Sequence, residues 1–125
     1  MSASKDAAQG WVALAGAGPG DEGLLTVRAA ELLGQASLVV AGAGLELVAR
    51  RHMSQDAVLA DPADGAGSAR AMVQAAKDGQ LAVRLFPGDP LLNGAVADAL
   101  AYAKAGVRFE IVPGVPAATA VPAYA

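Results

Sequence analysis

The segment Leu81–Pro90 constrains the fold of this chain more than any other stretch. Its apolar run, residues 81–86, is typical of a strand buried in a parallel sheet. The run leads directly into Pro87-Gly88-Asp89-Pro90. The prolines fix φ and donate no backbone hydrogen bond, whereas the glycine permits a tight turn or a close approach by a ligand. The segment therefore predicts a buried strand that ends in a rigid turn.

Asp89 has two interpretations at this position. It could cap a helix over residues 91–104, as a short carboxylate often does. It could instead bind a ligand, because open α/β sheets bind ligands at the carboxyl ends of their strands. Two similar turns, Gly18-Pro19-Gly20-Asp21 and Val112-Pro113-Gly114-Val115, also follow predicted strands. We expect the three turns to converge at one edge of the sheet and to hold a small polar ligand there.

Strand-like and helix-like segments alternate along the whole chain. The expected strands are 11–16, 37–41, 57–60, 81–86 and 108–112, and the expected helices are 23–34, 45–52, 68–77 and 91–104. Ser68 would cap the third helix, and Gly79 and Gly106 would end the last two. This alternation predicts an α/β fold with a five-stranded, mostly parallel sheet and helices on both faces.

The domain organisation follows from the two ends of the sequence. Residues 1–9 are small and polar, which predicts a disordered leader before a domain over residues 10–125. The sequence stops at Ala125 in an apolar segment without a return strand, whereas complete domains usually end at a wet surface. We therefore expect a fragment of a longer protein from which a second domain is absent.

The composition argues against several classes of site and partner. The chain has no cysteine and a single histidine, His52 at a predicted helix end, so we expect no metal centre. The net charge is −3 with scattered basic residues, which argues against nucleic acid as a partner. No signal peptide and no apolar run of membrane-spanning length is present. These features predict a cytoplasmic protein without a membrane partner.

The glycines after the first strand do not fit a dinucleotide-binding fingerprint. In Gly16-x-Gly18-x-Gly20 the third glycine comes one residue early, and residues 40–42 lack the acidic side chain that the ribose needs. No Gly-Lys-Ser/Thr follows, which excludes a P-loop. The chain also lacks a recognisable catalytic triad, so its catalytic residues are unknown at this stage.

Three blocks of sequence carry a recognisable pattern: Val12–Asp21 with Leu24-Leu25-Thr26, Val83-Arg84-Leu85 running into Gly88-Asp89-Pro90, and Glu110–Gly114 with Ala120–Ala125. Together they resemble the tetrapyrrole methylases, S-adenosylmethionine-dependent enzymes that include the uroporphyrinogen-III C-methyltransferases. The resemblance implies the N-terminal domain of that fold, with a second domain after Ala125. It also implies a homodimer, and a methyl donor bound between the two domains.

The resemblance further implies which residues contact S-adenosylmethionine. By motif these are Pro19, Pro87, Gly88, Asp89, Leu92, Pro116 and Ala117. Asp89 would meet the ammonium group of the donor, and Leu92 would pack against an apolar part of it. The implied substrate is uroporphyrinogen III, methylated on carbon on the route to precorrin-2, sirohaem and cobalamin.

Several positions depart from the family pattern. Ala41-Gly42 replaces a Tyr-Asp pair whose aspartate is a proposed proton acceptor, Ala95 replaces an arginine, Pro116 replaces a threonine, and no lysine lies near Asp61. The pattern is most similar to a divergent segment at the front of actinobacterial proteins whose remainder resembles uroporphyrinogen-III synthase. The alternatives are therefore half of a C-methyltransferase, a degenerate scaffold or dimerisation domain fused to a synthase, or another small-molecule-binding α/β domain.

Overall fold

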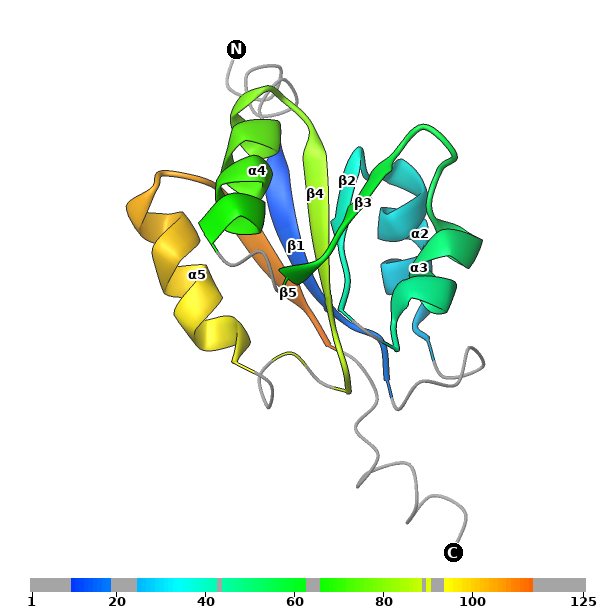
Figure 1. Ribbon diagram of the computed structural model, residues 1–125. Coiled ribbons are helices and arrows are strands. Elements are labelled where there is room, and N and C mark those ends of the chain that lie inside the picture. The colour runs from blue at the N-terminus through cyan, green and yellow to red at the C-terminus, as the bar shows by residue number, and fades with distance from the viewer. Residues whose placement is uncertain are drawn as a thin grey trace, which may run out of the picture.

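The computed structural model describes residues 10–18, 25–42, 44–62, 66–88, 90 and 94–113. Five strands form one sheet: β1 (Trp11–Gly16), β2 (Leu38–Val40), β3 (Val58–Ala60), β4 (Leu81–Phe86) and β5 (Phe109–Val112). The helices in these ranges are α2 (Val27–Gln35), α3 (Glu46–His52), α4 (Ala66–Lys77) and α5 (Ala95–Lys104). The α/β prediction is confirmed, and each expected strand lies within one residue of an observed one (Figure 1).

The sheet has the strand order β3-β2-β4-β1-β5, and all of its strand pairs are parallel. Strand β1 lies between β4 and β5, with Trp11 opposite Leu81 and Ala15 opposite Val112. The predicted sheet was mostly parallel, and the observed one is entirely so. The carboxyl ends of all five strands consequently meet at one edge, which faces the bottom of Figure 1.

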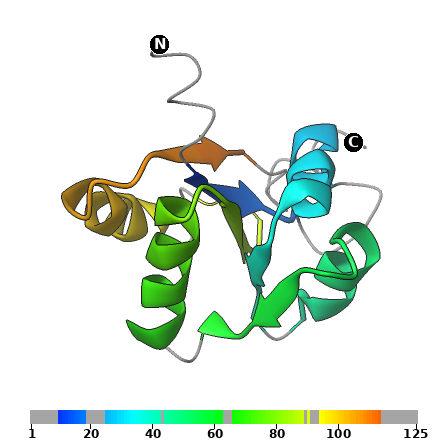
Figure 2. The same ribbon diagram turned by 90° about the horizontal axis from the view of Figure 1, so that it is seen from above.

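Helices cover both faces of the sheet, as Figure 2 shows from above. Helices α2 and α3 pack on one face, and α4 and α5 pack on the other, because opposite crossover directions place right-handed connections on opposite sides. Successive residues of a strand point to opposite faces of the sheet, so alternate residues pack into the two cores. One core contains Ala13, Val39, Val83 and the α2 residues Leu32 and Leu33, and the other contains Val12, Leu14, Val40, Met72 and Tyr102.

Helix starts differ from the predictions more than strands do. Helix α2 begins at Val27 instead of residue 23, because the Thr26 Oγ1 accepts a hydrogen bond from the Ala29 amide at 3.1 Å. Helix α4 begins at Ala66, so Ser68 lies inside it, buried, and the predicted Ser68 cap is wrong.

The start of α5 also corrects a prediction. The helix begins at Ala95, and Gly94 occupies its N-cap position at φ 93° without a side-chain cap. The expected helix start at residue 91 is therefore wrong, and the N-cap of α5 is Gly94 and not Asp89, which lies outside the described residues. The predicted ends are confirmed: the amides of Gly79 and Gly106 both bond to carbonyls of the preceding helix at 3.1 Å.

None of the helices in the described ranges is long and apolar enough to cross a membrane. The predicted leader, residues 1–9, and the segment 114–125 lie outside those ranges.

Candidate functional site

The turns after β1 and β4 join through their backbones at the carboxyl edge of the sheet. The Gly88 amide donates to the Gly18 carbonyl at 2.7 Å, and the Gly18 amide donates to the Gly88 carbonyl at 3.3 Å. Both glycines have positive φ, 71° at Gly18 and 67° at Gly88, where a Cβ would be strained. The predicted convergence of these two turns is confirmed, and we call this pair of bonds the Gly18–Gly88 bridge.

The remaining strands end near the same edge. Strand β5 runs in register with β1 and is followed by the exposed Pro113, while Gly114 lies outside the described ranges. The turns after β2 and β3 also lie together, because a Cβ placed on Gly42 would be 3.4 Å from the Pro62 Cγ. Segments that follow all five strands therefore gather at this edge.

Two of the seven predicted donor-binding residues are described. Pro87 is exposed and Gly88 is half-buried, and both lie at the carboxyl edge beside Gly18. The other five lie outside the described residues, so their contacts with a donor stay predictions: Pro19, Asp89, Leu92, Pro116 and Ala117.

A small cavity of about 190 Å³ also opens at this edge. It is lined by the ends of β2 and β3 and by α3, through Ala41, Leu59, Ala60, Asp61, Glu46 and Arg50. Ligand pockets usually occupy about 300–1,000 Å³, so this cavity has room for only part of a cofactor. Two cavities of about 200 and 370 Å³ share Gly10 at the opposite edge, away from the glycine turns.

An ion pair lies near the carboxyl edge, on the face of the sheet that α5 covers. The Arg84 Nη1 donates to the Asp98 Oδ2 at 2.5 Å, and the guanidinium carbon lies 4.8 Å from the centroid of the Phe86 ring. Beside them the Tyr102 hydroxyl donates to the Met72 Sδ at 3.3 Å. Burial, and then the negative charge of Asp98, raise the pKa of the Tyr102 phenol above its usual value.

This ion pair was not predicted from the sequence. Arg84 belongs to the motif that carries the resemblance, and the available signal was its place as the one charged residue within the apolar run 81–86. Its partner Asp98 could not be identified from the sequence, because the pairing depends on how α5 packs against β4.

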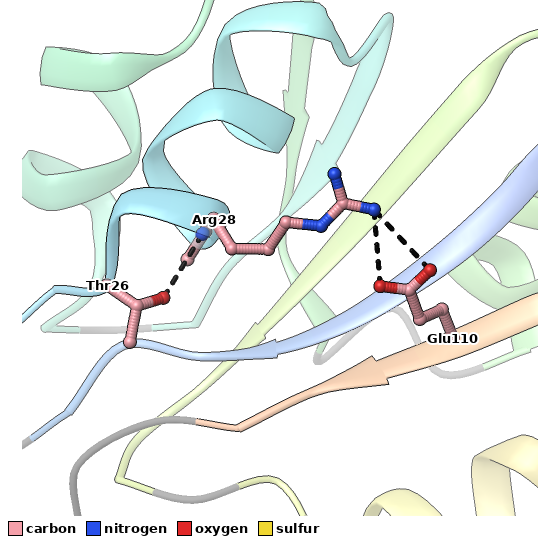
Figure 3. A network of polar contacts seen from close by, with 4 residues as sticks. Thr26, Arg28 and Glu110 are labelled. Carbon is pink, nitrogen blue, oxygen red and sulfur yellow. Dashed lines mark hydrogen bonds and ion pairs between the residues drawn. The ribbon is translucent and has the colours of Figure 1, made fainter.

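A second ion pair joins α2 to the edge strand β5, as Figure 3 shows. The Arg28 Nη2 lies 3.2 Å from the Glu110 Oε1 and 3.5 Å from the Oε2. Both side chains are about half exposed, so solvent screens this pair more strongly than the Arg84–Asp98 pair.

The chemical groups that the described edge offers are mainly backbone amides and carbonyls on small residues. Within the described ranges, no group of three or more His, Cys, Asp or Glu side chains could hold a metal ion. Glycines that leave room for a ligand, at the carboxyl ends of parallel strands, suit a polar molecule bound by main-chain hydrogen bonds.

The chain is similar in sequence to several siroheme synthases. The chain is 42% identical over 130 residues to siroheme synthase 1 of Klebsiella pneumoniae, and the match covers 93% of this chain and 26% of that protein. It is 38% identical over 138 residues to the siroheme synthase of Psychromonas ingrahamii, covering 99% and 28%. The chain thus spans about a quarter of the length of these curated relatives.

Solved structures match with the same fold. A uroporphyrin-III-C-methyltransferase from Thermus thermophilus has a TM-score of 0.74 at 30% identity, covering 92% of this chain and 52% of that one. A cobalt precorrin-4 methyltransferase of cobalamin biosynthesis has a TM-score of 0.78 at 31% identity, covering 90% and 49%. A third structure is the Thermus thermophilus enzyme complexed with S-adenyl homocysteine, with a TM-score of 0.73 at 32% identity, covering 90% and 48%.

The match to a family extends over nearly the whole sequence. Residues 12–125 match the tetrapyrrole (corrin/porphyrin) methylases, a range that includes the five strands except for Trp11, and the Gly18–Gly88 bridge. The fold, the convergent turns and these matches agree with one another. The chain therefore belongs to the tetrapyrrole methylase family.

Proposed function

We propose that this chain forms one wall of a site for S-adenosylmethionine-dependent methyl transfer to uroporphyrinogen III. The Gly18–Gly88 bridge carries the proposal, because it places two glycines, which have no Cβ, side by side where open α/β sheets bind ligands. The matched structure of a uroporphyrin-III C-methyltransferase complexed with S-adenyl homocysteine supports the choice of ligand. The siroheme synthase relatives support the tetrapyrrole substrate.

The proposed roles follow from the chemistry of each residue. Gly88 offers its backbone, Asp89 accepts a hydrogen bond from the donor's ammonium group, and Leu92 packs on an apolar part of the donor. The remaining contacts with the donor that the family pattern implies come from Pro19, Pro87, Pro116 and Ala117. S-adenosylmethionine supplies an electrophilic methyl group when it is bound.

Positioning provides most of the rate gain in this proposal. Holding two reactants in line can contribute about 7–11 kcal/mol to a bimolecular step. The pyrrole carbon that accepts the methyl group is already electron-rich, so proton loss can follow bond formation without a strong base on the protein. Gly42, at the position of the family's proposed proton acceptor, is therefore compatible with methyl transfer.

Calorimetry with S-adenosylhomocysteine on the full-length protein tests the proposal. Gly88→Ala would place a side chain at positive φ, which costs about 1–2 kcal/mol and would weaken binding about tenfold if it displaces the turn. Gly106→Ala is the matched control, because its φ of 74° is similar and a Cβ there meets no atom within 4 Å. Absent binding by the unmodified protein, or equal affinities for both variants, would contradict the donor site.

A scaffold without catalysis is the second candidate function. It is favoured by Gly42 and by Ala95, which is fully buried at the position of the family's arginine and so faces the core. Gly42→Asp in the full-length protein discriminates the two candidates, since the nearest atom to the new Cβ would be the Pro62 Cγ at 3.4 Å. Methyl transfer that rises on this substitution supports a weakened enzyme. A protein that dimerises without binding S-adenosylhomocysteine supports the scaffold.

A further inference from the structure

The Arg84–Asp98 ion pair connects the two elements that flank the Gly88 turn. Arg84 lies two residues before Phe86, the last residue of β4, and Asp98 lies in the first turn of α5. The chain between them includes Gly88. This ion pair therefore ties together the strand before and the helix after the connection that carries one half of the Gly18–Gly88 bridge.

The surroundings of Arg84 leave its guanidinium little freedom. The side chains of Arg84 and Asp98 are 29% and 27% exposed, against 50% and 44% for the Arg28–Glu110 pair. The Phe86 ring packs on the guanidinium at 4.8 Å, and the Arg84 Nε is buried with no hydrogen-bond partner in the part of the chain that the structure describes. Among the described residues, Asp98, the Phe86 ring and the Tyr102 hydroxyl contact this guanidinium. Asp98 is its charged partner, so removal of that carboxylate is expected to loosen the orientation of the arginine.

Backbone contacts transmit the position of β4 to the site. Arg84 lies opposite Leu14 in the register of β4 and β1. Beyond it, the Phe86 carbonyl accepts from the Ala17 amide at 2.8 Å, and the Gly88 amide donates to the Gly18 carbonyl at 2.7 Å. The end of β4, which Arg84 ties to α5, is therefore bonded through its backbone to the strand and turn that carry Gly18.

We propose that Arg84 is a positioning residue for the methyl-donor site: paired with Asp98, it holds the connection between β4 and α5 so that the backbone of Gly88 meets that of Gly18. The role concerns the geometry of the turn, and its consequence for the donor rests on the proposed function. Arg84 is not required to contact the donor in this arrangement.

The experiment uses the full-length protein and two independent readouts. Hydrogen exchange at the Gly88 amide reports the turn without any ligand, and calorimetry with S-adenosylhomocysteine reports the donor site. Arg84→Met is expected to speed the exchange and to weaken binding, each by about tenfold, because small displacements of binding groups have large effects. Arg28→Met, which breaks the exposed pair between α2 and β5, is the matched control and is expected to leave both values unchanged.

Conservative variants keep the test decisive if Arg84→Met fails to fold. Asp98→Asn preserves size and removes only the charge, and it is expected to reproduce the loss. Arg84→Lys keeps the charge without the planar fork and is expected to give an intermediate affinity. Unchanged exchange at Gly88 in these variants, or an equal effect of Arg28→Met, would overturn the proposal. If the unmodified protein binds no S-adenosylhomocysteine, the proposed function fails, and the exchange data alone decide the role of Arg84.

Discussion

At the scale of single residues, Gly10 has almost no room for a side chain. A Cβ there would lie 2.0 Å from the Gln80 carbonyl oxygen and 2.6 Å from that of Ala76, both of them backbone atoms. Gly10→Ala is expected to lower the free energy of unfolding by about 1–3 kcal/mol, because backbone must shift. Gly34→Ala in α2, whose nearest contact would be 3.5 Å, is expected to raise it by about 0.5–1 kcal/mol. Urea denaturation measures both, and similar effects would contradict the packing at Gly10.

Tyr102 predicts a pH dependence of stability. Burial and the Asp98 charge raise the pKa of its phenol in the folded state, whereas the unfolded phenol titrates near its usual value of 10.0. Above that pH the unfolded state binds fewer protons, so the stabilisation is present at lower pH and is lost as the pH rises through the folded pKa. Tyr102→Phe should therefore weaken the fall in unfolding free energy above about pH 10. Parallel curves for the two proteins in urea denaturation across pH 8–11 would show that burial does not perturb this phenol.

The residues of the site were only partly predictable from the sequence. Gly18 and Gly88 were identifiable because glycine after a buried strand signals a turn, and parallel strands bring such turns to one edge. The Arg84–Asp98 pair was not, since an arginine in a strand finds its partner only after a helix has packed on it. The buried position of Ala95 likewise depends on that packing.

At the scale of elements, the N-terminus of α2 depends on one side chain. The Thr26 hydroxyl accepts the hydrogen bond from the Ala29 amide, and the first turn of α2 has no acidic residue to assist it. Thr26→Ala is expected to lower the free energy of unfolding by about 0.5–2 kcal/mol, because a helix amide loses its partner. Thr26→Ser keeps the hydroxyl and should cost much less. Equal losses in thermal or urea unfolding would indicate that the threonine methyl group, not the cap, stabilises this end.

Strands were more predictable than helix starts for a physical reason. Buried parallel strands are nearly continuous apolar runs, so their limits are visible in the sequence, as at β1 and β4. A helix begins where a cap satisfies its first amides, and several residues before α2 were equally suited to that role. The N-cap of α5 is Gly94 at φ 93°, and it makes no side-chain hydrogen bond to the helix, so the pattern of side chains does not predict this helix start.

At the scale of the whole molecule, the chain covers about half of the solved structures that it matches, 52% in one case. A site between two domains needs both walls, since effective pockets bury about 70% or more of a ligand's surface. We therefore expect the isolated 125-residue chain to bind S-adenosylhomocysteine weakly and to self-associate through exposed apolar surface, which includes Val96 and Leu100 on α5. Light scattering and calorimetry test this. A monomer that binds S-adenosylhomocysteine at micromolar concentration would refute the half-site.

The strand order also governs how the chain is made. Strand β1 is translated before the other four strands, yet its neighbours in the sheet are β4 and β5, so Trp11 pairs with Leu81 only after the segment between them has been synthesised. At about 5–20 residues per second, the apolar strand is left without its partners for roughly 4–14 s. Pairing across such a separation is also slow to nucleate. The middle of the sheet closes only when β4 leaves the ribosome, and a nascent chain stalled before Leu81 presents an unpaired apolar strand to chaperones and proteases.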